Sequence, residues 1–160
     1  MKNEIRHALI LLAGVALCAF FFANVEIQIE GANGWAANLP TWRVEHHLLL
    51  DIFWGGRPMT GYHAWVFSFM LLMFHLPLLV TWKWSMKLEA RIIGCSMLFW
   101  IIEDFLWFIL NPAFGVSKLD PAHVPWHKFW FYGIPTDYVT FTLVGLALLV
   151  WSFLPARQKE

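Results

Sequence analysis

The sequence predicts an all-α integral membrane protein with four transmembrane helices. Of its 160 residues, 59% are hydrophobic and 14% are charged, whereas a soluble domain is nearer half apolar and a quarter charged. Eleven residues are tryptophan, a side chain that gathers where a membrane protein meets the water interface. The formal net charge is zero, which argues against a nucleic-acid partner because such proteins carry a basic face. The expected location is therefore the cell membrane.

Four apolar stretches approach the length of about 20 helical residues that a bilayer core requires. They cover residues 7–24, 60–82, 91–110 and 134–154, and we treat residues 1–160 as a single four-helix transmembrane domain. The first stretch follows Lys2 and Arg6, as the apolar part of a signal peptide would. No small-x-small cleavage site closes it, so we expect an uncleaved membrane span.

The distribution of positive charge predicts that both termini are cytoplasmic. Seven of the eleven Lys and Arg residues lie near the chain ends or in the short connection after the second span. The two long connections carry the other four, Arg43, Arg57, Lys118 and Lys128. Because cytoplasmic segments carry the excess of Lys and Arg, the long connections are expected on the outer side.

The first long connection contains the segment VEHHLLLDIFW, residues 44–54. Its pattern predicts a short amphipathic helix that lies in the membrane interface, with Leu48, Ile52 and Phe53 toward lipid. Gly55 and Gly56 follow the segment and are typical of a helix end.

Glu103 and Asp104 stand side by side in the apolar run FWIIEDFLWFIL of the third span. A charged side chain at the bilayer centre costs about 2.5–3.5 kcal/mol on insertion scales, so such acids usually face the bundle interior and pair with another group. Adjacent residues point about 100° apart around a helix and cannot both face one neighbour. We expect one acid to face the outer-side histidines, and the other to reach Arg43, Arg57 or backbone N–H groups.

Histidines also gather at the outer ends of the predicted spans. His63 lies near the start of the second span, and HVPWH supplies His123 and His127 at i and i+4. Imidazole and carboxylate together suit zinc or iron, and three protein ligands plus water are typical of a catalytic site. We therefore predict that His63, Glu103, His123 and His127 bind one divalent metal. Asp104 and Glu103 are the predicted catalytic acids, with Asp104 orienting an imidazole or acting as general base.

The secondary candidates are polar residues in or beside the outer connections: Glu45, His46, His47, Asp51, Asp137, Arg43 and Arg57. The alternative interpretation of the single histidines is that they are solvated at the membrane surface. For Glu103 and Asp104 the alternative is an ion pair or hydrogen bond that holds helices together.

Two functional hypotheses follow. The first is a metal-dependent membrane enzyme, a hydrolase or an oxidoreductase, acting on a lipid or another lipophilic molecule. The second is a non-catalytic accessory subunit, or a cofactor-binding protein, of a larger membrane complex. No nucleophile elbow, P-loop or CxxCH motif selects one chemistry. Membrane lipids are the expected partners, and a homo- or hetero-oligomer is compatible with the sequence.

Overall fold

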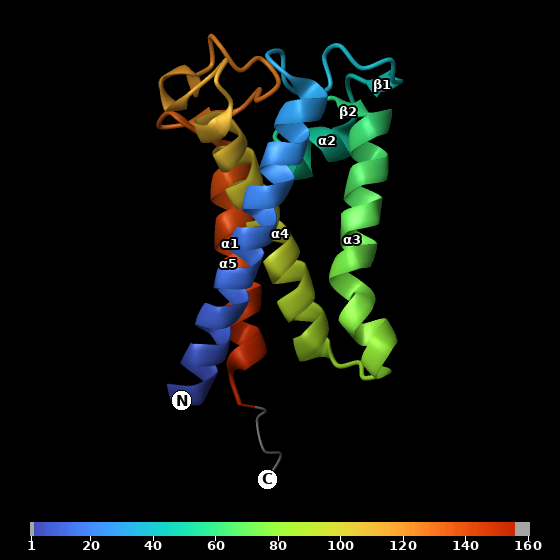
Figure 1. Ribbon diagram of the computed structural model, residues 1–160, viewed down its shortest axis with the longest axis vertical. Coiled ribbons are helices and arrows are strands. Elements are labelled where there is room, and N and C mark those ends of the chain that lie inside the picture. Colours follow the sequence, from blue (N-terminus) through green and yellow to red (C-terminus); the bar gives the residue numbers. More distant parts are fainter. Residues whose placement is uncertain (1, 156–160) are drawn as a thin grey trace.

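The computed structural model describes residues 2–155, and four long helices form its body (Figure 1). These are α1 (Lys2–Glu30), α3 (Gly61–Thr81), α4 (Met86–Leu110) and α5 (Thr136–Phe153). All four are long and apolar enough to cross a membrane, as predicted. The start of α1 and the end of α5 lie at one end of the bundle, and both long connections lie at the other, which we call the loop end. Arg157 and Lys159, used in the charge count, lie outside the described residues.

Helix α1 extends to Glu30 instead of ending near residue 24. The reason is a single buried stripe that runs along the helix and continues past the apolar segment. Its members are Val15, Ala19, Ala23, Glu26 and Glu30, and their spacing of three or four residues places them on one helical face. The two glutamates therefore belong to the buried face of α1, and not to the following loop.

Side-chain caps explain where the next two helices begin. Thr60 precedes α3, and its Oγ1 accepts a hydrogen bond from the backbone N–H of His63 at 3.1 Å. Ser85 precedes α4 and accepts from the backbone N–H of Leu88 at 3.2 Å. Such caps satisfy N–H groups that have no partner within the helix. The cap at Ser85 places the start of α4 ahead of the predicted residue 91.

Helix α4 is central and packs extensively against α1 and α5, while its contact with α3 is much smaller. Near the middle of the bundle, Val15 and Ala19 of α1 pack against Cys95 and Phe99 of α4. A second apolar cluster lies at the loop end. It contains Ala23, Trp35, Trp107, Phe108, Val124 and Trp126, so it joins α1 and α4 to both long connections.

The connections contain short elements that the all-α prediction lacked. Strand β1 (Arg43–Val44) pairs antiparallel with β2 (Met59–Thr60), with Arg43 opposite Thr60. Strand β3 (Trp130–Phe131) pairs with β4 (Ile134–Pro135), with Trp130 opposite Pro135. A 3-10 turn, η1, spans Val116–Lys118. The fold class is thus mostly helical, with two small β ribbons in the loops.

The helix predicted over residues 44–54 is shorter in the structure. Helix α2 covers Leu48–Phe53, because His47 caps its first turn by accepting from the backbone N–H of Leu49 at 3.2 Å. Leu48 and Ile52 are exposed, as expected for side chains that face lipid. Helix α2 lies between the loop-end halves of α1 and α3 (Figure 1). Its placement in the membrane interface remains a prediction.

Candidate functional site

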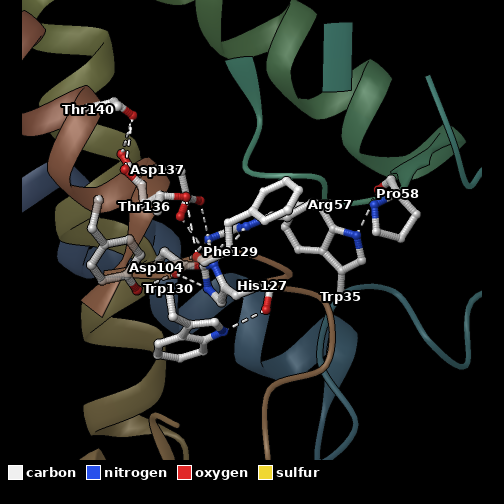
Figure 2. A network of polar contacts seen from close by, with 11 residues as sticks. Trp35, Arg57, Pro58, Asp104, His127, Phe129, Trp130, Thr136, Asp137 and Thr140 are labelled. Atoms are coloured by element: carbon white, nitrogen blue, oxygen red, sulfur yellow. Dashed lines mark hydrogen bonds and ion pairs between the residues drawn. The ribbon is translucent and has the colours of Figure 1, made fainter. Parts of the chain in front are cut away.

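A buried arginine joins two helices and two loops at the loop end (Figure 2). Arg57, which follows α2, is only 6% exposed. One of its terminal nitrogens lies 2.7 Å from Oδ2 of Asp137 on α5 and 3.3 Å from Oδ2 of Asp104 on α4. Its Nε donates to Nδ1 of His127, in the segment before β3, at 3.2 Å. The positive charge of Arg57 is therefore shared by two acids of the bundle.

His127 is fixed within this group by contacts to both ring nitrogens. A terminal nitrogen of Arg57 lies 2.8 Å from Nδ1 and 2.7 Å from Nε2 of His127. Nε2 also lies 3.4 Å from Oδ2 of Asp104, and Nδ1 lies 3.3 Å from Oδ1 of Asp137. The same Asp104 oxygen accepts from the hydroxyl of Tyr138. Trp130 Nε1 donates to the backbone carbonyl of His127 at 2.7 Å. Both ring nitrogens of His127 are thus in contact with Arg57 and with an acid of the bundle.

The environment of Arg57 keeps it charged. Burial alone lowers the pKa of its guanidinium, but the nearby carboxylates of Asp104 and Asp137 outweigh burial and raise that pKa. The guanidinium also lies over the ring of Trp35, 4.7 Å from the ring centroid. Trp35 is held in turn by a 2.8 Å hydrogen bond from its Nε1 to the carbonyl of Pro58. We call Arg57, Asp104, His127 and Asp137 the arginine network.

A second polar group lies between α1 and α3. Glu26, Glu30 and His63 each offer one ligand atom, and these three atoms lie within 4.8 Å of one another. All three side chains are buried. Nε2 of His63 is 3.6 Å from Oε1 of Glu30, close to the roughly 3.4 Å between donor atoms that each stand about 2.1 Å from a tetrahedral ion. These residues form the candidate metal group.

Neighbouring residues orient each member of the candidate metal group. The hydroxyl of Tyr62 donates to Oε1 of Glu26 at 3.1 Å, and the backbone N–H of Ala36 donates to Oε1 of Glu30 at 2.6 Å. Oγ1 of Thr60 is 2.7 Å from Nδ1 of His63. When Nδ1–H donates to that hydroxyl, the lone pair of Nε2 faces Glu30, the arrangement in which a metal-binding histidine is held by an outer partner.

Glu103 faces the same space from α4. It is only 4% exposed, and it lines one cavity together with Glu26, Glu30 and His63. Within residues 2–155, its Oε1 is buried without a hydrogen-bond partner, which costs about 1–3 kcal/mol, and more when the group is charged. The cavity has a volume of about 40 Å³, room for about three water molecules at 10–15 Å³ each. The two carboxylates and one imidazole of the candidate metal group are a donor set that suits a divalent cation, and the carboxylate of Glu103 lines the same cavity.

The structure separates the four residues predicted to bind one metal. His63 and Glu103 line the same cavity, but His127 belongs to the arginine network. His123 is 53% exposed, and its Nδ1 lies 2.8 Å from Oδ2 of Asp120. That hydrogen bond lowers the pKa of the Asp120 carboxyl. His123 and His127 are therefore not members of the three-residue group found in the described part of the chain.

Glu103 and Asp104 diverge as their positions on the helix predict. Asp104 is the acid that reaches Arg57, one of the three partners expected for one member of the pair. Glu103 instead faces the cavity that contains His63. Asp104 therefore makes the ion pair of the structural interpretation. Glu103 lines a cavity, as the site interpretation requires.

The secondary candidates divide in the same way. Asp137 and Arg57 are in the arginine network, while Arg43 donates to the backbone carbonyls of Ala36 and Ala37. The other four are exposed and do not line the cavity: Glu45, His46, His47 and Asp51. Of these, His47 has a structural role as the cap of α2.

Glu26 and Glu30 are the site residues that the sequence interpretation missed. Both were assigned to the outer connection, because the apolar run ends before them. The signal that reveals them is their spacing, which continues the stripe of Val15, Ala19 and Ala23 by helical steps. Comparisons of the chain with protein-family models, curated proteins and solved structures found no match. Function is therefore inferred from the geometry of the site.

Proposed function

We propose that this chain is a membrane protein that binds a divalent metal ion through Glu26, Glu30 and His63, and that it acts on a lipid or another lipophilic substrate. The observation that carries the proposal is the buried carboxylate of Glu103, which faces that group without a hydrogen-bond partner in residues 2–155. Across the same residues, no Lys or Arg forms an ion pair with these three glutamates, and Arg57 is already paired with Asp104 and Asp137. A divalent cation would offset their charge.

The proposed ligands suit zinc or iron, and each of the neighbouring groups has a defined task. Three protein ligands leave a coordination position for water or substrate. A metal bound there would make its water more acidic and polarise a substrate oxygen. Glu103 lines the cavity with a free carboxylate oxygen and serves as the general base in this proposal. Asp104 is a positioning residue in this proposal, because it holds Arg57 over Trp35, and Trp35 stacks on the ring of His63.

The surroundings of the cavity support a lipophilic substrate. Its lining includes the apolar side chains Trp54, Phe67, Trp100 and Phe141 beside the acids. Three of these lie on α3, α4 and α5, helices that are apolar enough to cross a membrane. This lining supports a substrate that approaches the polar group from the hydrocarbon region.

The second candidate function is a non-catalytic subunit or cofactor-binding protein. The arginine network favours it, because Arg57 ties α4, α5 and both long connections into one fixed unit. In that case the metal would be structural, or would be held for a partner in a larger complex.

Metal content per chain tests the proposal. Wild type purified without chelators should contain about one metal ion per chain by elemental analysis, and Glu26→Gln, Glu30→Gln and His63→Ala should lose it. Glu45→Gln and His123→Ala are the matched controls, because both side chains are exposed and neither lines the cavity. Metal-free wild type, or variants that retain metal as the controls do, would overturn the metal site.

Glu103→Gln separates the two candidate functions. The enzyme hypothesis predicts that this variant keeps its metal and its thermal stability, but stops converting membrane lipids in a mass-spectrometric comparison of vesicles incubated with each protein. Metal bound by wild type without any lipid conversion would instead support the accessory subunit.

A further inference from the structure

An apolar groove lies between α3 and α4, beside the polar cavity. It has a volume of about 220 Å³. Its walls include Phe67 and Leu71 of α3, Ile93, Met97 and Trp100 of α4, and Phe141 of α5. In Figure 1, α4 runs obliquely between α5 and α3 and approaches α3 toward the end away from the loops. The groove is therefore lined almost wholly by hydrocarbon and aromatic groups within the membrane-spanning part of the chain.

The groove and the polar cavity are adjacent and share part of their lining. Trp54, Phe67, Trp100 and Phe141 line both spaces. From Trp100, the wall of the groove continues along α4 to Ile93, about 10 Å at 1.5 Å per residue. A molecule whose apolar part lies along α4 in the groove would therefore have its polar end next to the cavity that the glutamates line.

We propose that the groove binds one hydrocarbon chain of a membrane lipid, and that the carbonyl or phosphoryl oxygen next to that chain is directed toward Glu26, Glu30 and His63. The placement of that oxygen rests on the proposed metal-dependent function. Among three carboxylates, a headgroup needs the metal to accept its carbonyl or phosphoryl oxygen, because an anionic group alone would be repelled. The substrate class is therefore a lipid with an ester or phosphate group next to its chain.

The dimensions of the groove select this occupant. An apolar cavity of about 150 Å³ accepts benzene, so on the same scale about 220 Å³ accommodates about nine carbon atoms. An α-helix of a partner protein is about 10–12 Å wide with its side chains and would not fit. A single alkyl chain fits, and the small contact between α3 and α4 leaves it a lateral path from the bilayer.

Photo-crosslinking tests where the lipid chain lies. The full chain is reconstituted in phosphatidylcholine vesicles that contain a trace of phosphatidylcholine with a diazirine midway along one acyl chain. After irradiation, peptide mass spectrometry should place most of the label on Phe67, Leu71 and Met97. Leu71→Trp, which fills the groove, should reduce this labelling several-fold. Leu72→Trp is the matched control, because Leu72 is also exposed but does not line the groove.

Two results would overturn the lipid site. One is equal labelling of the groove and of Leu72 and Val80, two exposed residues of α3. Equal labelling would indicate contact with the surrounding lipid only. The other is unchanged labelling of the groove in Leu71→Trp. Ser96→Leu, which fills the groove from α4, gives a second variant in case Leu71→Trp does not fold, and thermal melting confirms the fold of each.

Metal content measured on the same samples separates this inference from the proposed function. Leu71→Trp should keep its metal while it loses labelling, and Glu30→Gln should lose metal while the groove is still labelled. Groove labelling in a wild type that binds no metal would refute the metal-dependent function and leave the chain-binding site. Stoichiometric metal without groove labelling would refute the site alone.

Discussion

At the scale of single residues, Arg57 connects α4, α5 and the segment before β3 through Asp104, Asp137 and His127. Replacing it with methionine leaves two acids without their cation, and breaking a buried ion pair in this way costs about 3–5 kcal/mol. We expect Arg57→Met to lower the Tm markedly in detergent micelles. Arg43→Met is the control, because Arg43 donates only to backbone carbonyls. Equal Tm changes in the two variants would contradict the structural role of Arg57.

The neighbouring residues show how far sequence reasoning reaches at this scale. Helical geometry predicts that Glu103 and Asp104 diverge, and they do. Helical geometry does not predict which arginine pairs with Asp104, because Arg43 and Arg57 both lie in the first long connection. The choice depends on the chain path around α2 and β2, which places only Arg57 beside Asp104. The path of the chain likewise determines the partners of the histidines. His63 lies beside Glu30, which is distant in sequence, whereas His123 pairs with the nearby Asp120.

At the scale of elements, two glycines determine how closely α4 and α5 pack. A Cβ atom on Gly94 would lie 2.8 Å from the carbonyl oxygen of Gly145, closer than van der Waals contact allows. Small residues permit such a close approach of helix backbones in membranes. Gly94→Ala should therefore destabilise the protein by about 1–3 kcal/mol, the usual cost of overpacking.

Gly14→Ala is the matched control for Gly94→Ala. Gly14 is also in a helix, but a Cβ atom there would meet nothing within 4 Å. Because alanine favours a helix over glycine by about 1 kcal/mol, this change should leave the Tm unchanged or raise it. Thermal melting in detergent compares the two, and a lower Tm for Gly14→Ala than for Gly94→Ala would refute the proposed close packing.

The elements also show why sequence reasoning found the long helices and missed the ribbons. Hydropathy over about 20 residues identifies a span because the bilayer sets its length. The turn between β3 and β4 consists of Tyr132 and Gly133, both with positive φ, as in the tight hairpins that Asn-Gly usually forms. A Tyr-Gly pair does not predict a tight hairpin in the way that Asn-Gly does. Likewise, α1 was predicted too short because hydropathy falls at Glu26, although that residue faces the bundle.

At the scale of the whole molecule, the candidate metal group joins α1 to α3, two helices that are distant in sequence. A ligand that binds only the folded state stabilises it by RT ln(1 + [L]/Kd), about 2.7 kcal/mol at a hundredfold excess over Kd. Adding zinc or iron(II) to metal-depleted wild type should raise the Tm. Glu30→Gln should not respond, while Glu45→Gln should respond as wild type does. A response of Glu30→Gln equal to that of wild type would place the metal elsewhere.

The orientation of the molecule in the membrane determines which compartment the site faces. The start of α1 and the end of α5 lie at one end of the bundle, and the candidate metal group and the arginine network lie at the other. Because Lys and Arg are in excess near the termini and in the connection between α3 and α4, we predict cytoplasmic termini and a site in the outer leaflet. Polar contacts within the chain do not determine this orientation, since the bundle is unchanged when it is inverted.

Cysteine accessibility in right-side-out membrane vesicles measures the orientation. In a background with Cys18→Ser and Cys95→Ser, the two native cysteines, single cysteines replace His123 at the loop end or Lys83 between α3 and α4. Both positions are exposed. A membrane-impermeant maleimide should modify His123→Cys directly, and Lys83→Cys only after the vesicles are opened. The reverse pattern would place both termini outside and the candidate metal group in the inner leaflet, where any lipid substrate would come from the cytoplasmic face.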